Sequence, residues 1–494
     1  MNVGEYEIDN VVSGFAKRCA SAGVADRLAV RCGDDVLTYR ELWRLVSRAA
    51  AQLIELGITK GDVVALAADP SPAYIAYTMA TLTVGAVHFP LEPGGPDALT
   101  ESLARSGAQL IVADVAARSR FADAAMGDTK VWRAEEPLPD RTGPTVEIGP
   151  DDGAVLLSTS GSTGKRKNIS LTHQNVLANA AGVAERTSIT PDDTLLNCMP
   201  LYHTNALNNQ LFLPLLIGAG IALHRRFVPE KFFDSLQSEK PTYITGSPTM
   251  YRRLLPYPVP QGATSSLRFL RGGAAAFSED LHAEVEKHFG APLLVSWGLT
   301  EATCTSAMNP PGARRIGTVG TPLMGQDVAV LDFDDDIVLA PHSRGEIGIS
   351  GPNVAPEFGP GWLRTGDIGS FDEAGYLSIV GRRKELILRG GENIYPQEVE
   401  TVLLSHSDIT QCCVVGVPSN DYGEVPVACV ARRRHGPLSD ADLRMQLLEL
   451  ATRKLPKYAV PAQLLLLDEL PTIGVGKADR RTMKALATEF MASV

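Results

Sequence analysis

The chain has 494 residues, of which 44% are hydrophobic and 21% are charged, and its formal net charge is −11. This length allows about three domain-sized units, and the negative charge argues against a nucleic-acid partner, because such proteins carry a basic face. Seven cysteines without a CxxC pair indicate a reducing compartment and no zinc site.

The sequence predicts neither a secretory signal nor an integral membrane segment. Its first ten residues contain neither a basic stretch nor an apolar core. The longest apolar run, residues 211–223, is too short to span a bilayer and contains proline and glycine. We expect a buried strand–turn–strand at this run and a cytoplasmic location for the protein.

Helical and extended stretches alternate from the N-terminal part onward. Residues 39–57 carry apolar side chains at helical spacing and end on a glycine. Residues 62–68 have the composition of a buried strand, residues 72–86 are again helical, and "VHFPLEP" follows them. Alternation of this kind predicts a mostly parallel sheet covered by helices.

The segment "STSGSTGKRKN", residues 158–168, has the composition of a phosphate-binding loop. It follows an apolar strand and precedes a helix that Thr172 is expected to cap. Strand, glycine-rich loop and helix together can hold phosphates with backbone N–H groups. Gly161 and Gly164 are too close in sequence for a Walker loop, which needs four residues between its glycines.

Two later segments place polar side chains directly after apolar strands or in tight turns. "SWGLTEATC", residues 296–304, brings an aromatic ring, a hydroxyl and a carboxylate together. Trp297 can stack on a base, and Glu301 can hold Mg²⁺. "GWLRTGDIG", residues 361–369, sets Asp367 in a turn, where its carboxylate can accept both hydroxyls of a ribose.

The type of secondary structure that the sequence predicts changes from about residue 320. Short strands and tight turns dominate there, and a compact mixed α+β stretch with a helix near residues 440–454 follows. The boundary is predicted at "GRRKE", residues 381–385, which is polar and charged between two apolar strands. "PTIGVGKADRR", residues 471–481, presents Lys477 beside a glycine-rich turn.

In this order and at these separations, the segments resemble the adenylate-forming superfamily of acyl-CoA synthetases, peptide-synthetase adenylation domains and beetle luciferases. The resemblance also includes "LTYRELWRLVSRAAAQL", "GAVHFPLEP", "MPLYHTNAL" and "RGGAAAFSEDL", and so covers essentially the whole chain. It implies an α/β fold with a large N-terminal domain of mixed sheets covered by helices, a small β-barrel-like part, and a small mobile α+β C-terminal domain. The AMP-binding domain is expected at residues 1–381 and the C-terminal domain at residues 385–494, with a hinge at residues 382–384.

The resemblance implies an enzyme with two half-reactions. A carboxylic acid attacks the α-phosphate of ATP in the presence of Mg²⁺, which gives an acyl-adenylate and pyrophosphate. The acyl group then passes to a thiol, with coenzyme A as the expected co-substrate, and AMP is released. The glycine-rich loop holds the β- and γ-phosphates, so the spacing of a Walker loop is not required.

The family's roles fall on particular residues of this chain. Lys477, Glu301, His203 and Thr163 are the expected catalytic residues, and Glu301 is the expected metal ligand. Lys477 also contacts the nucleotide, His203 lies between acyl pocket and thiol channel, and Lys384 is the pivot of the hinge. Gly390 and Gly391 are expected to line the CoA channel. The other residues expected to bind ATP are Thr159, Ser160, Gly161, Ser162, Gly164, Lys167, Gly273, Ala274, Ala275, Ser296, Trp297, Gly298, Thr300, Asp367 and Arg382.

The phosphate loop departs from the family pattern, which continues with Pro-Lys-Gly where this chain has Arg166, Lys167 and Asn168. Asparagine tolerates positive φ better than most residues, so we expect the loop backbone to be retained. Neither this change nor a shortened segment before Asp367 removes a catalytic group.

The acyl pocket is expected to be polar. Asn205 and Asn209 follow His203 where many relatives have aromatic or aliphatic residues, and buried amides need hydrogen-bond partners. A small or medium polar acid is therefore favoured over a long-chain fatty acid, for example a hydroxylated or amino-substituted aromatic acid or a dicarboxylate.

The sequence leaves three functional hypotheses open, which differ in the acceptor of the acyl group or in whether the protein is a catalyst. "LILRGGENIYPQEVE" is most similar to stand-alone CoA ligases of the oxalate and coumarate type. Because no carrier domain follows Val494, a carrier protein would have to be a separate chain, and an amine is a further alternative. A non-catalytic AMP-binding scaffold is the third reading, and the joint presence of Glu301, Asp367, Arg382 and Lys477 argues against it.

Overall fold

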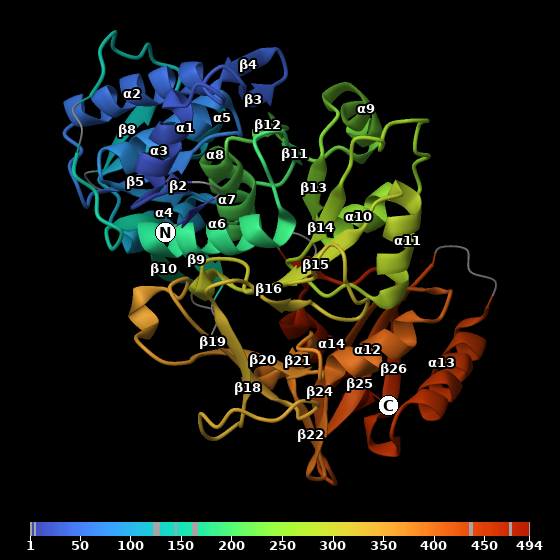
Figure 1. Cartoon of the computed structure of the whole chain (residues 1–494). Helices are drawn as coiled ribbons and strands as arrows, with labels where there is room; N and C mark the ends of the chain where they lie inside the picture. Colours follow the sequence, from blue (N-terminus) through green and yellow to red (C-terminus); the bar gives the residue numbers. More distant parts are fainter. Residues whose placement is uncertain are drawn as a thin grey trace.

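The computed structural model describes residues 2–3, 6–121, 129–143, 146–160, 166–433, 438–473 and 477–493. The described chain forms two helix-covered sheets, a small antiparallel sheet and a C-terminal α+β unit (Figure 1). No helix in these ranges is long and apolar enough to cross a membrane.

The first sheet has the strand order β10-β9-β6-β5-β7-β8. Its strands pair in parallel except for the edge strand β10, which is antiparallel to β9. The outer face carries helices α4 (Pro96–Ser106) and α5 (Val115–Phe121). The strands are β5 (Val63–Ala67), β6 (Val87–Pro90), β7 (Leu110–Ala113), β8 (Lys130–Arg133), β9 (Gly153–Ser160) and β10 (Arg166–Thr172).

The second sheet has the order β17-β16-β15-β14-β13-β11-β12-β3-β4 and is parallel from β15 to β3. Helices α9 (Pro229–Glu239), α10 (Pro248–Leu254) and α11 (Glu279–Phe289) cover one face. The strands are β3 (Leu28–Cys32), β4 (Asp35–Thr38), β11 (Thr194–Asn197), β12 (Gly220–Leu223), β13 (Tyr243–Gly246), β14 (Phe269–Gly272), β15 (Leu293–Trp297), β16 (Ala307–Met308) and β17 (Thr321–Pro322).

The largest hydrophobic core lies between these two sheets and is built mainly from helices. Its strand residues come from both sheets, so it joins them into one domain. Residues 211–223, predicted as strand–turn–strand, form a helix, a turn and then β12, because the run continues the helical segment that begins at Thr204. The helices are α1 (Val11–Ala20), α2 (Tyr39–Glu55), α3 (Pro72–Thr83), α6 (His173–Thr187), α7 (Thr204–Leu207) and α8 (Leu213–Ile217), with the π-helical segment η1 (Asn208–Phe212).

The part predicted to be barrel-like is a four-stranded antiparallel sheet. Its strands, in spatial order, are β18 (Asp327–Leu331), β19 (Gly345–Ser350), β20 (Leu363–Phe371) and β21 (Leu377–Arg382). The side chain of Trp297, at the end of β15, packs against the apolar residues of this sheet. The small sheet is thereby fixed to the edge of the second sheet.

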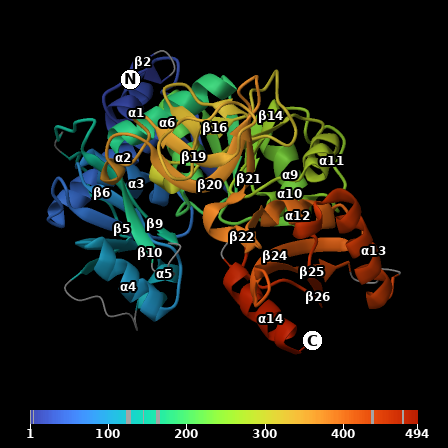
Figure 2. The ribbon, with the colours of Figure 1, turned by 90° about the horizontal axis from the view of Figure 1, so that it is seen from below.

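The C-terminal unit is a five-stranded sheet with helices on both faces (Figure 2). Helices α12 (Pro396–Leu404) and α13 (Asp440–Lys454) cover one face, and α14 (Arg480–Ser493) covers the other. The strands are β22 (Ile387–Arg389), β23 (Glu392–Ile394), β24 (Ile409–Ser419), β25 (Gly423–Arg432) and β26 (Gln463–Leu467), and β27 (Thr472–Ile473) pairs with β28 (Lys477–Ala478) beside them. This α+β architecture agrees with the prediction from sequence.

His88, on β6, is fully buried beside Tyr74, and neither ring nitrogen has a hydrogen-bond partner among the described residues. Burial lowers the pKa of His88 to about 3, so the unfolded chain binds a proton that the folded chain excludes. The stability that this neutral ring contributes is complete above about pH 6.5 and is lost progressively as the pH falls toward 3. His88→Leu should therefore reduce the loss of unfolding free energy between pH 7 and pH 5 by about 2 kcal/mol. Urea unfolding at the two pH values measures this, with exposed His342→Asn as the control; equal losses in both variants would contradict it.

Candidate active site

The predicted adenine-binding segments meet at the carboxyl ends of β14 and β15, where ligands of parallel α/β sheets commonly bind. Ser296 Oγ donates to the carbonyl oxygen of Gly272 at 3.1 Å. A β-carbon placed on Gly273 would lie 3.2 Å from Ser296 Oγ and 3.8 Å from Asn205 Nδ2. Residues predicted to contact the adenine and the acid are thus neighbours at one sheet edge.

Asp367, predicted to bind the ribose, is connected to the same edge through Trp297. The indole N–H of Trp297 donates to Asp367 Oδ2 at 2.8 Å, and Arg382 Nε lies 2.8 Å from Asp367 Oδ1. Asp367 is buried and stands opposite Arg382 in the β20–β21 register. The stacking of Trp297 on adenine stays a prediction, while its N–H positions the Asp367 carboxylate.

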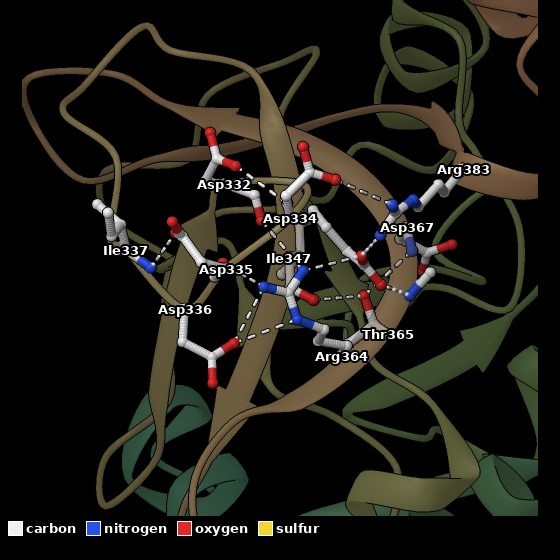
Figure 3. Close-up of polar contacts among 12 residues, drawn as sticks. Asp332, Asp334, Asp335, Asp336, Ile337, Ile347, Arg364, Thr365, Asp367 and Arg383 are labelled. Atoms are coloured by element: carbon white, nitrogen blue, oxygen red, sulfur yellow. Dashed lines mark hydrogen bonds and ion pairs between the residues drawn. The ribbon is translucent and has the colours of Figure 1, made fainter.

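Glu346, which its sequence context does not single out, connects the backbone next to Asp367 on β20 with Arg383 at the end of β21. This buried carboxylate accepts from the backbone N–H of Gly366 at 3.0 Å and pairs with Arg383 at 2.9 Å and with Arg364 at 3.2 Å. Arg364 also binds the loop at Asp332–Asp336, and Arg383 approaches Asp334 (Figure 3). A charged residue inside the apolar strand "GEIGIS" is the sequence signal that could have found Glu346.

Backbone strain also marks the carboxyl ends of β14 and β15. Ala274 and Thr303 have φ values of 67° and 69°, which are uncommon for residues with a side chain. At Gly298 a β-carbon would lie 2.0 Å from the carbonyl oxygen of Cys304, so only glycine fits there. The backbone of the "SWGLTEATC" turn is therefore held in one conformation by its surroundings.

Glu301 lies in the 3₁₀ turn η2 (Thr300–Ala302) and is half-buried. Its backbone oxygen accepts from Ala355 N at 2.9 Å, but its carboxylate has neither a hydrogen-bond nor an ion-pair partner among the described residues. No group of three or more metal-ligating side chains occurs in the described parts of the chain. One available carboxylate fits Mg²⁺, which is commonly held by one or two carboxylates together with substrate phosphates.

His203 and Asn205 lie at the start of helix α7, beside the turn after β15. Thr204 Oγ1 donates to the carbonyl oxygen of Thr303, which brings the two segments into contact. The His203 ring lies 4.5 Å from that of Tyr202, measured between centroids. Among the described residues, Asn205 Oδ1 accepts only long hydrogen bonds, of 3.5 Å, from Asn209 and Gln210.

Asn209, in contrast, is fully buried and uses both ends of its amide within the protein. Its Nδ2 donates to Cys304 Sγ and to Thr305 Oγ1 at 2.9 Å each, and its Oδ1 accepts from Asn179 Nδ2 at 2.9 Å. Asn205 is therefore the better candidate for contact with an acid.

We expect opposite consequences from two matched substitutions. Asn209→Leu removes the acceptor of the buried Asn179 Nδ2 and the donor to Thr305 Oγ1, and it should lower the free energy of unfolding by roughly 2–4 kcal/mol. Asn205→Leu should leave the melting temperature nearly unchanged and shift the preference among acids by about 1–3 kcal/mol in relative kcat/KM. Calorimetry and competition between acids measure the two effects, and a stable Asn209→Leu variant with altered acid preference would reverse the assignment.

Four of the residues predicted to bind phosphate, Gly161, Ser162, Thr163 and Gly164, lie outside the described residues. The segment joins β9 to β10 as an antiparallel hairpin, with Thr159 opposite Lys167. The expected strand–loop–helix order is therefore wrong: α6, capped by Thr172 as predicted, begins only after β10.

Asn168, the departure from the family pattern, is held firmly in β10. Its side chain accepts from Ser158 Oγ at 2.7 Å and donates to the carbonyl oxygen of Arg105 at 3.2 Å. It is absent from the residues with positive φ, so the tolerance of asparagine for that conformation is not what retains the backbone.

The predicted hinge is the point at which ion pairs change from one unit to the other. Arg382 and Arg383 pair with Asp367 and Glu346 of the large domain. Glu385 pairs with Arg480 of the C-terminal unit at 3.1 Å, and Lys384 lies between, exposed in a 3₁₀ turn (Arg383–Glu385). The boundary and the role of Lys384 stay predictions.

The other residues predicted to act from the C-terminal unit, Lys477, Gly390 and Gly391, lie in two different hairpins. The backbone of Lys477 pairs with Ile473 in the β27–β28 hairpin, and its side chain lies outside the described residues. Gly390 and Gly391, both with positive φ, form the two-residue turn between β22 and β23. Figure 1 shows β22 at the bottom of the molecule, away from β14 and β15, so the structure does not bring these glycines to the site.

Comparison with known proteins adds to this geometry. Residues 16–358 match the family "AMP-binding enzyme", and residues 398–477 match "AMP-binding enzyme C-terminal domain". The chain is 35% identical to feruloyl-CoA synthase of Amycolatopsis sp over 473 residues, covering 91% of this chain and 94% of the relative. It is 31% identical to oxalate–CoA ligase of Arabidopsis thaliana, covering 96% of this chain and 98% of the relative.

A solved structure shows the same architecture. o-Succinylbenzoate CoA synthetase from Bacillus subtilis in complex with the acyl-adenylate intermediate OSB-AMP superimposes with a TM-score of 0.85 at 28% identity, over 97% of this chain and 98% of that one. The same protein in complex with ATP and magnesium ion gives a TM-score of 0.84.

Proposed function

The chain belongs to the family of AMP-binding enzymes, and we propose that it is an ATP-dependent acid–thiol ligase that joins a small or medium polar or aromatic carboxylic acid to coenzyme A. The observation that carries this proposal is the continuous set of contacts from Asn205 and Gly273 through Ser296 and Trp297 to Asp367. Because these contacts connect the Asn205 amide with the Asp367 carboxylate, they support an acid-binding role for Asn205 and a ribose-binding role for Asp367.

In the first half-reaction, a carboxylate oxygen of the acid forms a bond to the α-phosphorus of ATP, and the bond from that phosphorus to the pyrophosphate oxygen breaks. Asp367, oriented by Trp297 and Arg382, holds the ribose hydroxyls. Lys477 stabilises the negative charge that develops between the acid and the α-phosphate. Glu301 would hold Mg²⁺, which would neutralise part of the negative charge of the phosphates.

In the second half-reaction, the thiol of coenzyme A attacks the acyl carbon, the bond to the AMP oxygen breaks, and the thiol proton is lost. Lys477 and the turn at Gly390 and Gly391 belong to the same C-terminal unit. Because that turn lies far from β14 and β15 (Figure 1), it needs a rotation about Lys384 to line the thiol channel. His203 lies between the acid and the thiol.

The site and the relatives support a polar acid as the substrate and coenzyme A as the acceptor. Asn205 favours an acid with a polar group, and the relatives compared above are named for feruloyl-CoA and oxalate. Both are CoA enzymes, which favours coenzyme A over a carrier protein or an amine as the acceptor.

Exchange of labelled pyrophosphate into ATP across a panel of aromatic and short acids tests the first half-reaction. We expect exchange with a subset of the panel and, when coenzyme A alone is added, conversion to acyl-CoA with stoichiometric AMP. Exchange without acyl-CoA formation would favour a carrier protein or an amine, and silence across the whole panel would favour a non-catalytic scaffold.

A further inference from the structure

A row of buried polar side chains, Asn197, Thr245 and Arg271, crosses the face of the second sheet that points into the main core. Thr245 and Arg271 are register partners on β13 and β14, and Asn197 follows Leu196, the partner of Ile244. Each of the three is at most 1% exposed. Asn197 Nδ2, Thr245 Oγ1 and all three guanidinium nitrogens of Arg271 have no hydrogen-bond partner among the described residues.

Arg271 is the exceptional member of this polar row, because it carries a charge. It is the largest fully buried side chain of the described chain. Burial lowers the pKa of the Arg271 guanidinium, and the groups that act on it besides burial are Cys304, Tyr243 and Tyr251 rather than any carboxylate. An unpaired buried cation is strongly unfavourable, and native proteins normally give each buried polar group a partner.

The polar row adjoins the acid-binding end of the candidate site. Arg271 stands two residues before Gly273, about 7 Å along an extended strand, and Gly273 neighbours Asn205. The guanidinium lies close enough to Cys304 to oppose the rise in the pKa of that thiol, and Cys304 Sγ accepts from Asn209 Nδ2. Arg271 therefore extends the site away from the nucleotide, toward the far end of a bound acid.

We propose that Arg271 binds a second anionic group of the acid, so that the substrate is a short carboxylic acid with a further carboxylate or sulfonate. This inference rests on the proposed ligase function. Guanidinium and carboxylate form paired N–H···O bonds. The bound anion would therefore accept hydrogen bonds from the guanidinium nitrogens, which have no partner among the described residues. The short reach from Gly273 to Arg271 limits the acid to a few carbons between its two charged ends.

Gln210, a neighbour of Asn205, is a side chain that can move to admit the acid. Gln210 lies in η1, where its Oε1 has no partner among the described residues and its Nε2 donates only to Met199 Sδ and, at 3.5 Å, to Asn205 Oδ1. Thioether sulfur is a weak acceptor, so rotation of Gln210 costs little. A π-helical turn such as η1 is frequent at functional sites.

Matched pairs of acids test the proposal: oxalate with acetate, malonate with propionate, and succinate with butyrate. In each pair a carboxylate replaces a methyl group. Adenylate formation by the wild type should favour at least one diacid over its partner by about 100-fold or more in kcat/KM, because a buried polar group left unpaired penalises the wrong substrate. Arg271→Met should abolish or invert this ratio, and Arg271→Lys should retain part of it.

Several outcomes separate this proposal from the ligase function itself. Activity with monoacids and no preference for diacids, or an unchanged ratio in Arg271→Met, would overturn the role of Arg271 while leaving the ligase intact. Arg271→Met should fold, since apolar replacements of buried ions are often neutral or stabilising, and exposed Arg253→Met is the control. If no acid in any panel forms adenylate, the thermal shift given by malonate or succinate with a non-hydrolysable ATP analogue tests the diacid site. A shift in the wild type that is lost in Arg271→Met supports this site. Absence of a shift in the wild type refutes it.

Discussion

Glu301→Gln is expected to lower the rate of acyl-adenylate formation by about 100-fold or more while leaving the melting temperature unchanged. The Glu301 carboxylate has neither a hydrogen-bond nor an ion-pair partner in the described structure, so its neutralisation removes no stabilising contact. A neutral amide is a poor ligand for a hard dication, and the charge on the departing pyrophosphate then goes uncompensated. Pyrophosphate exchange at saturating ATP measures the loss.

The matched control is Glu373→Gln, which removes an exposed carboxylate far in sequence from the turn after β15. It should leave both exchange and melting temperature at wild-type values. Near-normal exchange by Glu301→Gln with a normal melting curve would remove this carboxylate from the site. A lowered melting temperature would instead show that Glu301 has a structural role.

The sequence predicts well those elements whose pattern is local. The helix expected at residues 39–57 is α2, followed by Leu56 and by Gly57 with positive φ, and the strand expected at 62–68 is β5. Both have an apolar pattern that satisfies one periodicity only. Ser296 and Trp297 lie at the end of a buried strand as expected, but Asp367, expected in a tight turn, lies within β20 opposite Arg382. Their roles toward adenine and ribose stay predictions.

The phosphate-loop hairpin is not predictable in the same way. β10 is an edge strand of the first sheet, so "RKNISLT" can stay polar and shows no apolar run. The sequence then reads as loop up to the helix cap at Thr172, although the chain pairs with β9 throughout.

Tertiary partners explain the other differences. Asn209 looks like a pocket residue in sequence, but its partners Asn179 and Thr305 lie 30 and 96 residues away. The roles of Glu346 and Arg271 likewise become apparent only from their burial and from their neighbours on adjacent strands. A charged residue inside an apolar strand marks such positions, but it does not say whether the partner is a protein group or a ligand.

Exposed polar contacts connect the large domain with the C-terminal unit, and their weakness affects how easily the hinge can move. Arg344 pairs with Glu398 at 2.7 Å and lies over the Tyr395 ring, but both charged side chains are about 40% exposed. Arg252 donates to the carbonyl oxygen of Thr410 at 3.2 Å. Exposed pairs of this kind contribute about 0–1 kcal/mol each, so they can be exchanged for others when the unit rotates.

Lys477→Ala and Lys384→Pro are therefore expected to disable opposite half-reactions. Lys477→Ala removes the charge that stabilises the adenylation transition state and should lower pyrophosphate exchange by about 100-fold or more, while thioester formation from supplied acyl-adenylate continues. Lys384→Pro fixes φ between the pairs that bind Arg383 to the large domain and Glu385 to the C-terminal unit. It should leave exchange largely intact and block the thiol step, which single-turnover assays with isolated adenylate and coenzyme A measure.

Lys484→Ala, which removes an exposed lysine on α14, is the control for charge removal. Loss of the same half-reaction to the same degree in both variants would show that one fixed arrangement performs both steps.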